Sequence, residues 1–271
     1  MNIYISIVSH NNWNMIKDNH ELLRINQLDN VKVCIKDNTG EAELMTFCRD
    51  NQIDYLSESK GLGFGANNNY IFNYVLARFS PKKDDVFLLL NPDVYFSFEQ
   101  FLLLNSELRT CSQQVFTVDL FKDNDFTIRD PFIRSFPRAF DFFSSFVLKK
   151  NNTIIDREKP INQPIDWCAG SFMGFNIETY LKLKGFDEAY FMYCEDIDLC
   201  YRANELGIKL KYYENIKAVH LAQHSNRKFM SKSFRWHLKS IFRYLFISRL
   251  PRISTLLGIK KISSINQDNI R

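Results

Sequence analysis

Short apolar runs alternate with segments of helical spacing in the first half of the chain. The apolar, β-branched runs lie at residues 3–8, 31–35, 86–90 and 115–118. They predict strands, while the spacing of apolar residues over 13–28 and 41–51 predicts helices between the first three. This alternation favours an α/β sheet as the centre of the fold.

Polar clusters follow three of the predicted strands. Asp37-Asn38-Thr39-Gly40 comes after the strand at 31–35, a glycine-rich loop comes after Tyr55, and Asn91-Pro92-Asp93 comes after the strand at 86–90. Ligands of open α/β sheets bind beyond the carboxyl ends of the strands, so these clusters predict a site. Residues 121–164, with four prolines and many aromatic residues, predict long loops and short helices.

Length and composition exclude several classes of protein. The chain has 271 residues, of which 45% are apolar and 24% charged, which suffices for a full core and excludes disordered and fibrous proteins. No run reaches the roughly 18 apolar residues of a membrane-spanning helix, and the six-residue apolar segment at the N-terminus resembles a strand more than a signal peptide. Six scattered cysteines indicate reduced thiols in a cytosolic protein.

The net charge of +4 divides unevenly along the chain. Residues 1–214 hold 23 basic and 30 acidic residues, a net charge of −7, whereas residues 215–271 hold 12 basic and 1 acidic, a net charge of +11. An acidic body would carry the chemistry, and a basic tail would meet nucleic acid or a membrane surface. We therefore predict a catalytic domain over 1–225 and a basic, amphipathic helical region over 226–271.

Helical spacing within the tail separates basic from apolar residues. The basic stripe consists of Lys228, Lys232, Arg235, Lys239 and Arg243, and the apolar stripe of Phe234, Leu238, Ile241 and Leu245. Such a helix suits contact with an anionic membrane, where each basic residue contributes about 1 kcal/mol. The alternative is a helix that packs on the catalytic domain with a solvated charged face.

The glycine-rich loop Gly61-Leu-Gly63-Phe-Gly65-Ala-Asn67 leads into a helix expected over 67–79. Its backbone amides at the helix start could bind phosphate oxygens. The spacing G-x-G-x-G differs from the dinucleotide fingerprint G-x-G-x-x-G. A turn followed by an asparagine helix cap is the alternative interpretation.

Two acidic motifs could carry chemistry. Asp93 places one carboxylate at the sheet edge, where a hard cation bound to a nucleotide diphosphate takes one or two protein carboxylates. Glu195, Asp196 and Asp198 lie among apolar neighbours, and in a helix that begins near Glu195 the side chain of Asp196 can point toward a cleft. Burial raises the pKa of a carboxyl group, which suits a general base. An ordinary turn and an acid-capped helix start are the alternatives.

His220 lies in a predicted strand at 218–221, and His224 follows it. Because that segment is not helical, the four-residue spacing does not favour a zinc site formed by the two histidines. A structural hydrogen-bonding role is the alternative for each.

In their order along the chain, these motifs resemble family 2 inverting glycosyltransferases. The resemblance covers residues 1 to about 245 and is greatest to bacterial rhamnosyltransferases of O-antigen and cell-wall assembly. It rests on Val8-Ser9-His10-Asn11, Asp37-Asn38, Gly61–Asn69, Asn91-Pro-Asp93, Asp166-Trp167-Cys-Ala-Gly170-Ser171, Glu195-Asp196-x-Asp198 and His220. It implies a GT-A type fold, a Rossmann-like sheet flanked by helices, followed here by the basic C-terminal helix.

The resemblance also implies roles for individual residues. Asp196 matches the catalytic base, Asp93 the last aspartate of the metal-binding D-x-D motif, and His220 the histidine that completes the metal shell. Asn91 stands at the first D-x-D position, which leaves one carboxylate for Mg²⁺ or Mn²⁺ and implies a weaker metal site. Substrate binding is implied for Ser9, Asp37, Asn38, Gly61, Gly63, Asn67, Asn91, Trp167 and Glu195, with Asp37 accepting from the pyrimidine N3–H.

The implied reaction is the transfer of L-rhamnose from dTDP-β-L-rhamnose to a polyprenyl-diphosphate-linked N-acetylglucosamine, with inversion in a single displacement. The expected location is cytoplasmic, peripheral on the inner face of the bacterial cytoplasmic membrane, with no nucleic-acid partner. Galactofuranosyl, glucosyl and mannosyl donors are alternatives. More distant alternatives are a nucleotide-binding oxidoreductase and a nucleic-acid-binding protein.

Overall fold

The computed structural model describes residues 1–110, 113–148, 150–159, 161, 163–221, 232–250, 258–259 and 261–265. Its strands are β1 (Ile3–Ser9), β2 (Val31–Asp37), β3 (Asp54–Leu56), β4 (Val86–Leu90), β5 (Val94–Tyr95), β6 (Val115–Phe121), β7 (Ile133–Arg134), β8 (Trp167–Cys168), β9 (Phe172–Asn176) and β10 (Leu210–His220). Its helices are α1 (Trp13–Lys17), α2 (His20–Asn26), α3 (Ala42–Asp50), α4 (Phe64–Phe79), α5 (Phe98–Thr110), α6 (Ala139–Val147), α7 (Ile177–Lys182), α8 (Glu195–Glu205) and α9 (Lys232–Arg243), the last continued by the π-helical turn η1 (Tyr244–Ser248).

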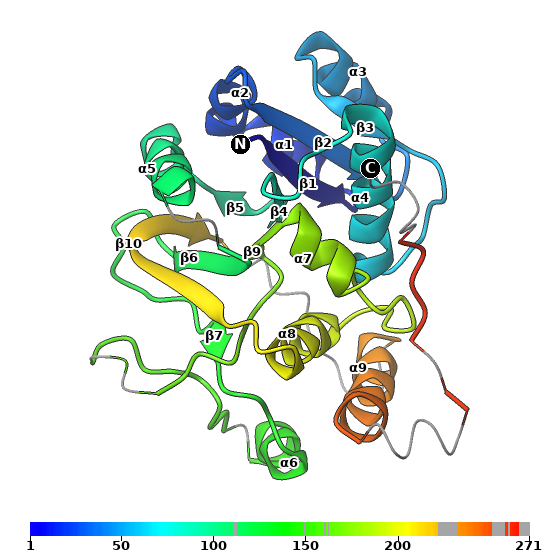
Figure 1. Cartoon of the computed structure of the whole chain (residues 1–271), viewed down its shortest axis with the longest axis vertical. Helices are drawn as coiled ribbons and strands as arrows, with labels where there is room; N and C mark the ends of the chain where they lie inside the picture. Colours follow the sequence, from blue (N-terminus) through cyan, green and yellow to red (C-terminus); the bar gives the residue numbers. More distant parts are fainter. Residues whose placement is uncertain are drawn as a thin grey trace.

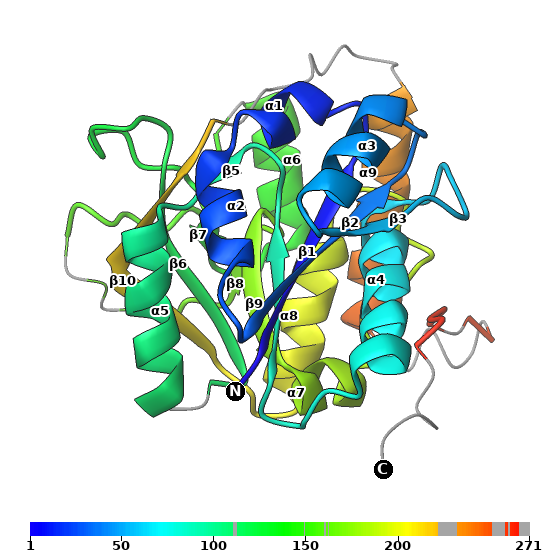
Figure 2. The ribbon, with the colours of Figure 1, turned by 90° about the horizontal axis from the view of Figure 1, so that it is seen from above.

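A mixed sheet forms the centre of the molecule, in the strand order β3-β2-β1-β4-β9-β6-β10-β5. Strands β1 to β4 pair in parallel, whereas β9 runs antiparallel between β4 and β6. Figure 2 shows α2 and α5 on one side of the sheet and α4, α7 and α8 on the other. Because both faces are covered, β4 is buried along its whole length, as its continuous apolar sequence predicts.

The predicted α/β fold is confirmed, with local differences. The helix expected over 13–28 is divided into α1 and α2, because the Asn19 side chain accepts from the backbone N–H of Leu22 and begins a second helix. Helix α4 begins at Phe64, three residues before the expected start. Strands β5 and β9 were not predicted, since each is short or flanked by loops and pairs with strands distant in sequence.

The C-terminal helix α9 packs against the preceding part of the chain, beside α8 in Figure 1. The Trp236 ring lies 4.4 Å from that of Phe191, and Ser240 Oγ donates to the Met192 carbonyl at 2.9 Å. Arg243 pairs with the buried Asp187 at 2.6 Å. The predicted boundary between 225 and 226, together with Lys228, lies outside the described residues.

Neither membrane-spanning helices nor disulfides are found among the described residues. No described helix combines the length and apolar composition needed to cross a membrane. The described cysteines are buried free thiols: Cys34, Cys48, Cys168, Cys194 and Cys200. Cys111 lies outside the described residues.

We predict that Arg243→Met lowers the free energy of unfolding by about 3 kcal/mol, because it leaves the buried Asp187 carboxylate without its cation. Urea unfolding measures this change. Arg24→Met, which removes an exposed pair with Glu21, is the control and should cost less than about 1 kcal/mol. Equal losses in the two variants would contradict the stabilising role of the Arg243–Asp187 pair.

Candidate active site

The ends of β1 and β2 meet the glycine-rich loop at one edge of the sheet. Ser9 and Asp37 are partners in the parallel register. The Asn38 side chain accepts from the Leu62 N–H and donates to the Leu62 carbonyl, each at 3.0 Å. Two of the three predicted polar clusters, the one after β2 and the glycine-rich loop, are therefore brought together beside the end of β1.

The Asp37 carboxylate organises the turn that follows β2. Its oxygens accept from the backbone N–H groups of Thr39 at 2.9 Å and Gly40 at 2.7 Å, and from the Tyr55 hydroxyl at 2.8 Å. Burial would raise the pKa of Asp37, but these hydrogen bonds outweigh it and hold the pKa below its usual value. A nucleotide base would have to share the Asp37 oxygens, which already accept hydrogen bonds within the turn. The contact of Asp37 with the pyrimidine N3–H therefore stays a prediction.

The glycine-rich loop is fixed against the segment that precedes α8. A Cβ at Gly63 would lie 2.3 Å from the Phe191 carbonyl oxygen, so only glycine fits, and the Phe64 N–H donates to that same oxygen at 3.0 Å. Asn67 donates to the Leu62 and Gly63 carbonyls, both at 3.0 Å. Its own Oδ1 is buried without a hydrogen-bond partner.

A histidine between two carboxylates lies where β4 and β10 end. His220 Nε2 is 3.5 Å from Asp93 Oδ2, and its Nδ1 is 2.7 Å from Asp130 Oδ2. Burial would lower the pKa of His220, but the hydrogen bonds and charges of Asp130 and Asp93 raise it to about 9. Asp130 was not predicted, because it lies in the irregular segment 121–164 and no motif spacing marks it.

The side chains of Asp93 and His220 could supply only part of the coordination shell of a divalent ion. Asp93 and His220 lie side by side, and the Asp130 carboxylate orients the imidazole through its other nitrogen, as the hydrogen-bond partners of metal-bound histidines commonly do. No group of three or more His, Cys, Asp or Glu side chains in the described part of the chain is arranged to hold a metal ion. A Mg²⁺ or Mn²⁺ ion here would need further oxygens, which a diphosphate supplies.

The acidic cluster occupies the first turn of α8, after two residues of left-handed backbone. Tyr193 and Cys194 have φ values of 72° and 63°, a conformation that costs non-glycine residues energy and is concentrated at functional sites. Asp196 accepts from the N–H of Ile197 at 2.9 Å and from that of Gly170 at 3.3 Å. The turn thus fixes the carboxylate while leaving acceptor capacity on its oxygens.

The three carboxyl groups of this turn have different environments. Burial raises the pKa of Asp196, and burial together with the charge of Asp196 raises the pKa of Glu195. Glu195 Oε2 is buried without a hydrogen-bond partner. Asp198 instead pairs with Arg202 at 2.8 Å and accepts from the Ser248 hydroxyl. Asp198 is structural, while Glu195 and Asp196 retain capacity for a ligand.

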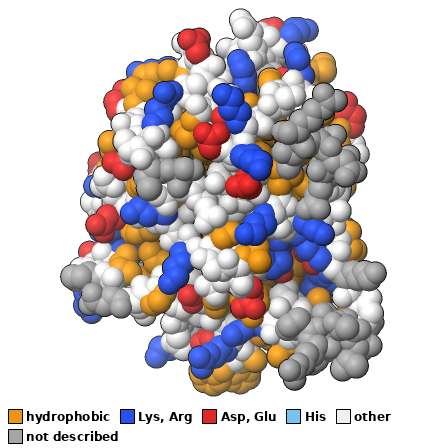
Figure 3. Space-filling view, viewed as in Figure 1, with side chains coloured by type: hydrophobic (Ala, Val, Ile, Leu, Met, Phe, Trp, Pro, Cys, Tyr) orange, Lys and Arg blue, Asp and Glu red, His pale blue; other side chains and the backbone are white. Residues whose placement is uncertain are grey.

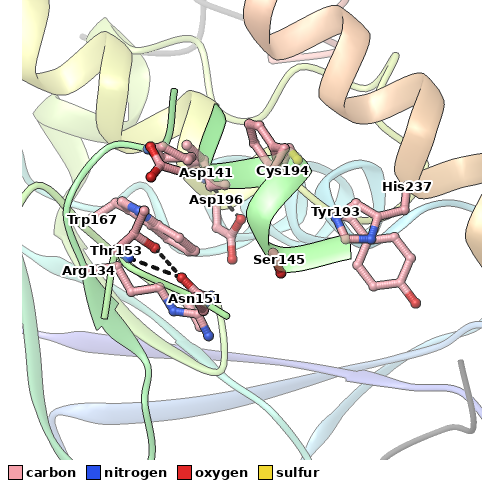
Figure 4. A pocket seen from close by; sticks show the side chains of 14 residues that line it. Arg134, Asp141, Ser145, Asn151, Thr153, Trp167, Tyr193, Cys194, Asp196 and His237 are labelled. Atoms are coloured by element: carbon pink, nitrogen blue, oxygen red, sulfur yellow. Dashed lines mark hydrogen bonds between the residues drawn. The ribbon is translucent and has the colours of Figure 1, made fainter. Parts of the chain in front are cut away.

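Asp196 lines a cavity of about 280 Å³ between α6, α8 and α9 (Figure 4). The lining residues are Arg134, Pro137, Asp141, Phe142, Ser145, Asn151, Thr153, Trp167, Ala169, Tyr193, Cys194, Asp196, Ile197 and His237. Of the predicted site residues, Asp196 and Trp167 line it. Arg134 and His237 were not predicted, because nothing in their local sequence distinguishes them from surface residues.

Two consecutive residues connect this cavity to the sheet edge. Gly170 donates its N–H to Asp196, and the carbonyl of Ser171 accepts from the Asn91 N–H at 2.9 Å. Asn91 begins the turn that carries Asp93. The cavity with Asp196 and the Asp93–His220 pair therefore lie on either side of one short backbone segment.

The sequence is similar to that of a known protein over nearly its whole length. Over 265 residues the chain is 40% identical to rhamnosyltransferase WbbL of Escherichia coli (strain K12), a match that covers 97% of the chain and 98% of the relative. The chain belongs to this rhamnosyltransferase family. A shorter match, 31% over 90 residues, is to the N-acetylglucosaminyl-diphospho-decaprenol L-rhamnosyltransferase of Mycobacterium tuberculosis (strain ATCC 25618 / H37Rv) and covers 33% of the chain and 29% of that relative. No family model matches the chain.

Solved glycosyltransferases share the fold of this rhamnosyltransferase. GalNAc-T7, crystallised with UDP, GalNAc and Mn²⁺, aligns with a TM-score of 0.63 at 10% identity over 95% of this chain and 50% of its own. The mannosyltransferase PcManGT from Pyrobaculum calidifontis, in complex with GDP-Man and Mn²⁺, aligns with a TM-score of 0.53 at 12% identity over 95% of this chain and 73% of its own. The expected GT-A fold is confirmed, and the enzyme is a hexosyltransferase.

We predict that Arg134→Met shifts the acidic limb of the pH–rate profile to higher pH. The charge of Arg134 lowers the otherwise raised pKa of Asp196, so its removal leaves Asp196 protonated at a pH where the wild-type group is already ionised. Arg134→Lys keeps the charge and serves as the control. A limb that stays in place in Arg134→Met, or moves to lower pH, would show that Asp196 does not set it.

Proposed function

We propose that this rhamnosyltransferase moves L-rhamnose from dTDP-β-L-rhamnose to a polyprenyl-diphosphate-linked N-acetylglucosamine and inverts the anomeric centre. The observation that carries this proposal is the half-buried Asp196 carboxylate, which lines a cavity and is held one backbone segment away from the Asp93 turn. The mycobacterial relative is named for the N-acetylglucosaminyl-diphospho-decaprenol acceptor. A lipid-linked acceptor of the same chemical class is proposed for this chain.

The nucleotide diphosphate is proposed to bind at the edge formed by Ser9, Asp37, Asn38 and the glycine-rich loop. Gly61 has open space beside its Cα, Gly63 seats the loop against the Phe191 carbonyl, and amides near the start of α4 favour anions. Asp93 would hold a Mg²⁺ or Mn²⁺ ion together with diphosphate oxygens, and His220 would join them once the metal displaces the proton from its Nε2. That ion, when bound, would neutralise the charge that develops on the leaving diphosphate.

The rhamnosyl group is proposed to lie between the diphosphate and Asp196. Buried polar atoms without hydrogen-bond partners include Asn67 Oδ1, Ser171 Oγ and Glu195 Oε2. Each unpartnered buried group costs free energy until it is satisfied, and sugar hydroxyls are both donors and acceptors. We assign Asn67 and Glu195 to hydroxyl recognition, with Asn91 and Trp167 at the border between donor and acceptor.

In the proposed reaction Asp196 removes the proton from the acceptor hydroxyl. The oxygen forms a bond to the anomeric carbon on the face opposite the diphosphate, and the bond from that carbon to the diphosphate breaks. The proton stays on the Asp196 carboxyl and the electron pair leaves with the nucleoside diphosphate. The raised pKa of Asp196 suits it to accept a proton near neutral pH.

We predict that Asp196→Asn lowers turnover by about 10²-fold or more and leaves nucleotide affinity nearly unchanged, since an amide cannot accept the hydroxyl proton. Release of nucleoside diphosphate is followed with dTDP-rhamnose and the lipid-linked acceptor, and affinity by titration calorimetry. Glu205→Gln, an exposed acid at the far end of α8, is the matched control.

Near-normal turnover of Asp196→Asn would overturn the assignment of the base. In the wild type, a donor panel with galactofuranosyl, glucosyl and mannosyl nucleotides tests the sugar. Faster turnover of any of these than of dTDP-rhamnose would overturn the donor. The oxidoreductase and nucleic-acid-binding alternatives are set aside, because family membership rests on nearly the whole chain.

A peripheral location at an anionic membrane through α9 is also proposed, since a lipid-linked acceptor is held at a bilayer. The exposed basic side chains of α9 include Arg235 and Lys239. Arg243 does not belong to this basic face, because its guanidinium turns inward to Asp187. The side chains of Lys228 and Lys232 lie outside the described residues.

A further inference from the structure

Helix α6 exposes aromatic side chains on the face that points away from the protein. Phe140 is 65% and Phe143 54% exposed, with ring centroids 6.4 Å apart, and Leu148 is exposed directly after the helix. The opposite face is packed, since Phe142 contacts the Tyr244 ring at 6.1 Å and Ser144 is buried. A helix at the surface of a water-soluble protein normally has polar residues on its solvent-facing side. Grouped apolar side chains on that side mark an interaction site.

Helix α9 and η1 expose a second apolar row. Leu238, Phe242 and Phe246 follow at steps of four, so they share one helical face, and the rings of Phe242 and Phe246 are 4.7 Å apart. The exposed Arg235 and Lys239 lie along the same side. Separate basic and apolar stripes were predicted. Because Ile241 is buried and Leu238 is exposed, the outer face instead mixes cations with apolar side chains.

The two helices lie at the same end of the molecule, away from α1 to α5 (Figure 1). Arg249 donates to the Pro137 carbonyl at 3.1 Å and joins the segment after η1 to the start of α6. The cavity that holds Asp196 lies between them, lined by Asp141 and Ser145 of α6 and by His237 of α9. In Figure 3, hydrophobic side chains gather at this end over α6, with Lys and Arg side chains beside them.

We infer that α6 and α9 together form one insertion surface for an anionic lipid bilayer, with the aromatic residues of α6 as its second anchor. Aromatic rings that enter the interface beside cations that meet anionic headgroups are the usual chemistry of such binding. A second copy of the chain fits less well, because a symmetric contact would bring like charges of Arg138, Arg235 and Lys239 together. Helix α9 itself contains no acidic residue to pair with them.

The insertion surface partly rests on the proposed function, and it adds how the cavity would be presented to a lipid-linked acceptor. Docking through both helices would bring the mouth of the cavity between them to the headgroup layer. An acceptor whose lipid stays in the bilayer could then reach Asp196 with its sugar. The surface itself is independent of the sugar transferred, so its test does not require the reaction.

We predict that the double variant Phe140→Ser, Phe143→Ser binds vesicles of phosphatidylglycerol and phosphatidylethanolamine about tenfold more weakly than wild type, as measured by flotation. Leu102→Ser, Leu103→Ser on α5 is the matched control, because it also removes two exposed apolar side chains, 42% and 38% exposed, from a helix far from α6. It should bind like wild type.

A charge variant keeps the test decisive should the aromatic variant fold poorly. Arg235→Glu, Lys239→Glu should lose binding to the anionic vesicles, and wild type should bind vesicles of phosphatidylcholine alone far more weakly. Turnover of a water-soluble acceptor analogue should stay within about twofold of wild type in the aromatic variant, because neither phenylalanine lines the cavity.

Flotation of the aromatic variant at the wild-type level would overturn the proposal. A second result would also overturn it: the wild type sediments as a dimer, and the aromatic variant is a monomer that still binds vesicles as the wild type does. The aromatic face would then bind a second copy of the chain. If the wild type binds vesicles but transfers no rhamnose, the proposed function fails and the insertion surface stands.

Discussion

The hydrogen bonds of Gly170 and Ser171 hold the two halves of the site in one arrangement. Gly170 donates to Asp196 and Ser171 accepts from Asn91, so a two-residue segment fixes the carboxylate relative to the turn of Asp93. The segment has little freedom of its own. A Cβ at Gly170 would lie 2.9 Å from the Phe64 ring, and Phe172 directly after it pairs with Leu90 in the sheet. Displacement of this segment would move Asp196 and the turn of Asp93 together.

Neighbouring carboxyl groups of the site differ in their partners and in their pKa values. Asp198 is neutralised by Arg202 and supports η1 through Ser248, whereas Glu195 and Asp196 have raised pKa values and few partners. Across the segment, Asp93 and Asp130 face one imidazole and raise its pKa. One side of the site thus favours protons on its acids, and on the other side two carboxylates favour positive charge between them, which suits the proposed displacement of a diphosphate.

Features that depend on local sequence were predictable, and those that depend on distant partners were not. Strand β4 and the turn of Asp93 follow from an apolar run and Asn-Pro-Asp, which act within a few residues. Asp130 reaches His220 from 90 residues away, and β9 enters the sheet between strands it does not adjoin in sequence. Helical spacing predicted a helix at α9, but not that its outer face mixes cations with apolar side chains. It could not show that Arg243 turns inward, because Asp187 is 56 residues distant.

In the proposed mechanism the sugar is transferred in a single displacement, with the Asp196 carboxylate as the base. The most direct measurement is the anomeric configuration of the product formed from dTDP-β-L-rhamnose and a polyprenyl-diphosphate-linked N-acetylglucosamine, determined by nuclear magnetic resonance. A single displacement at Asp196 predicts an α-linked rhamnose, the inverse of the donor. A β-linked product would require a second displacement or a different mechanism, and would contradict the account.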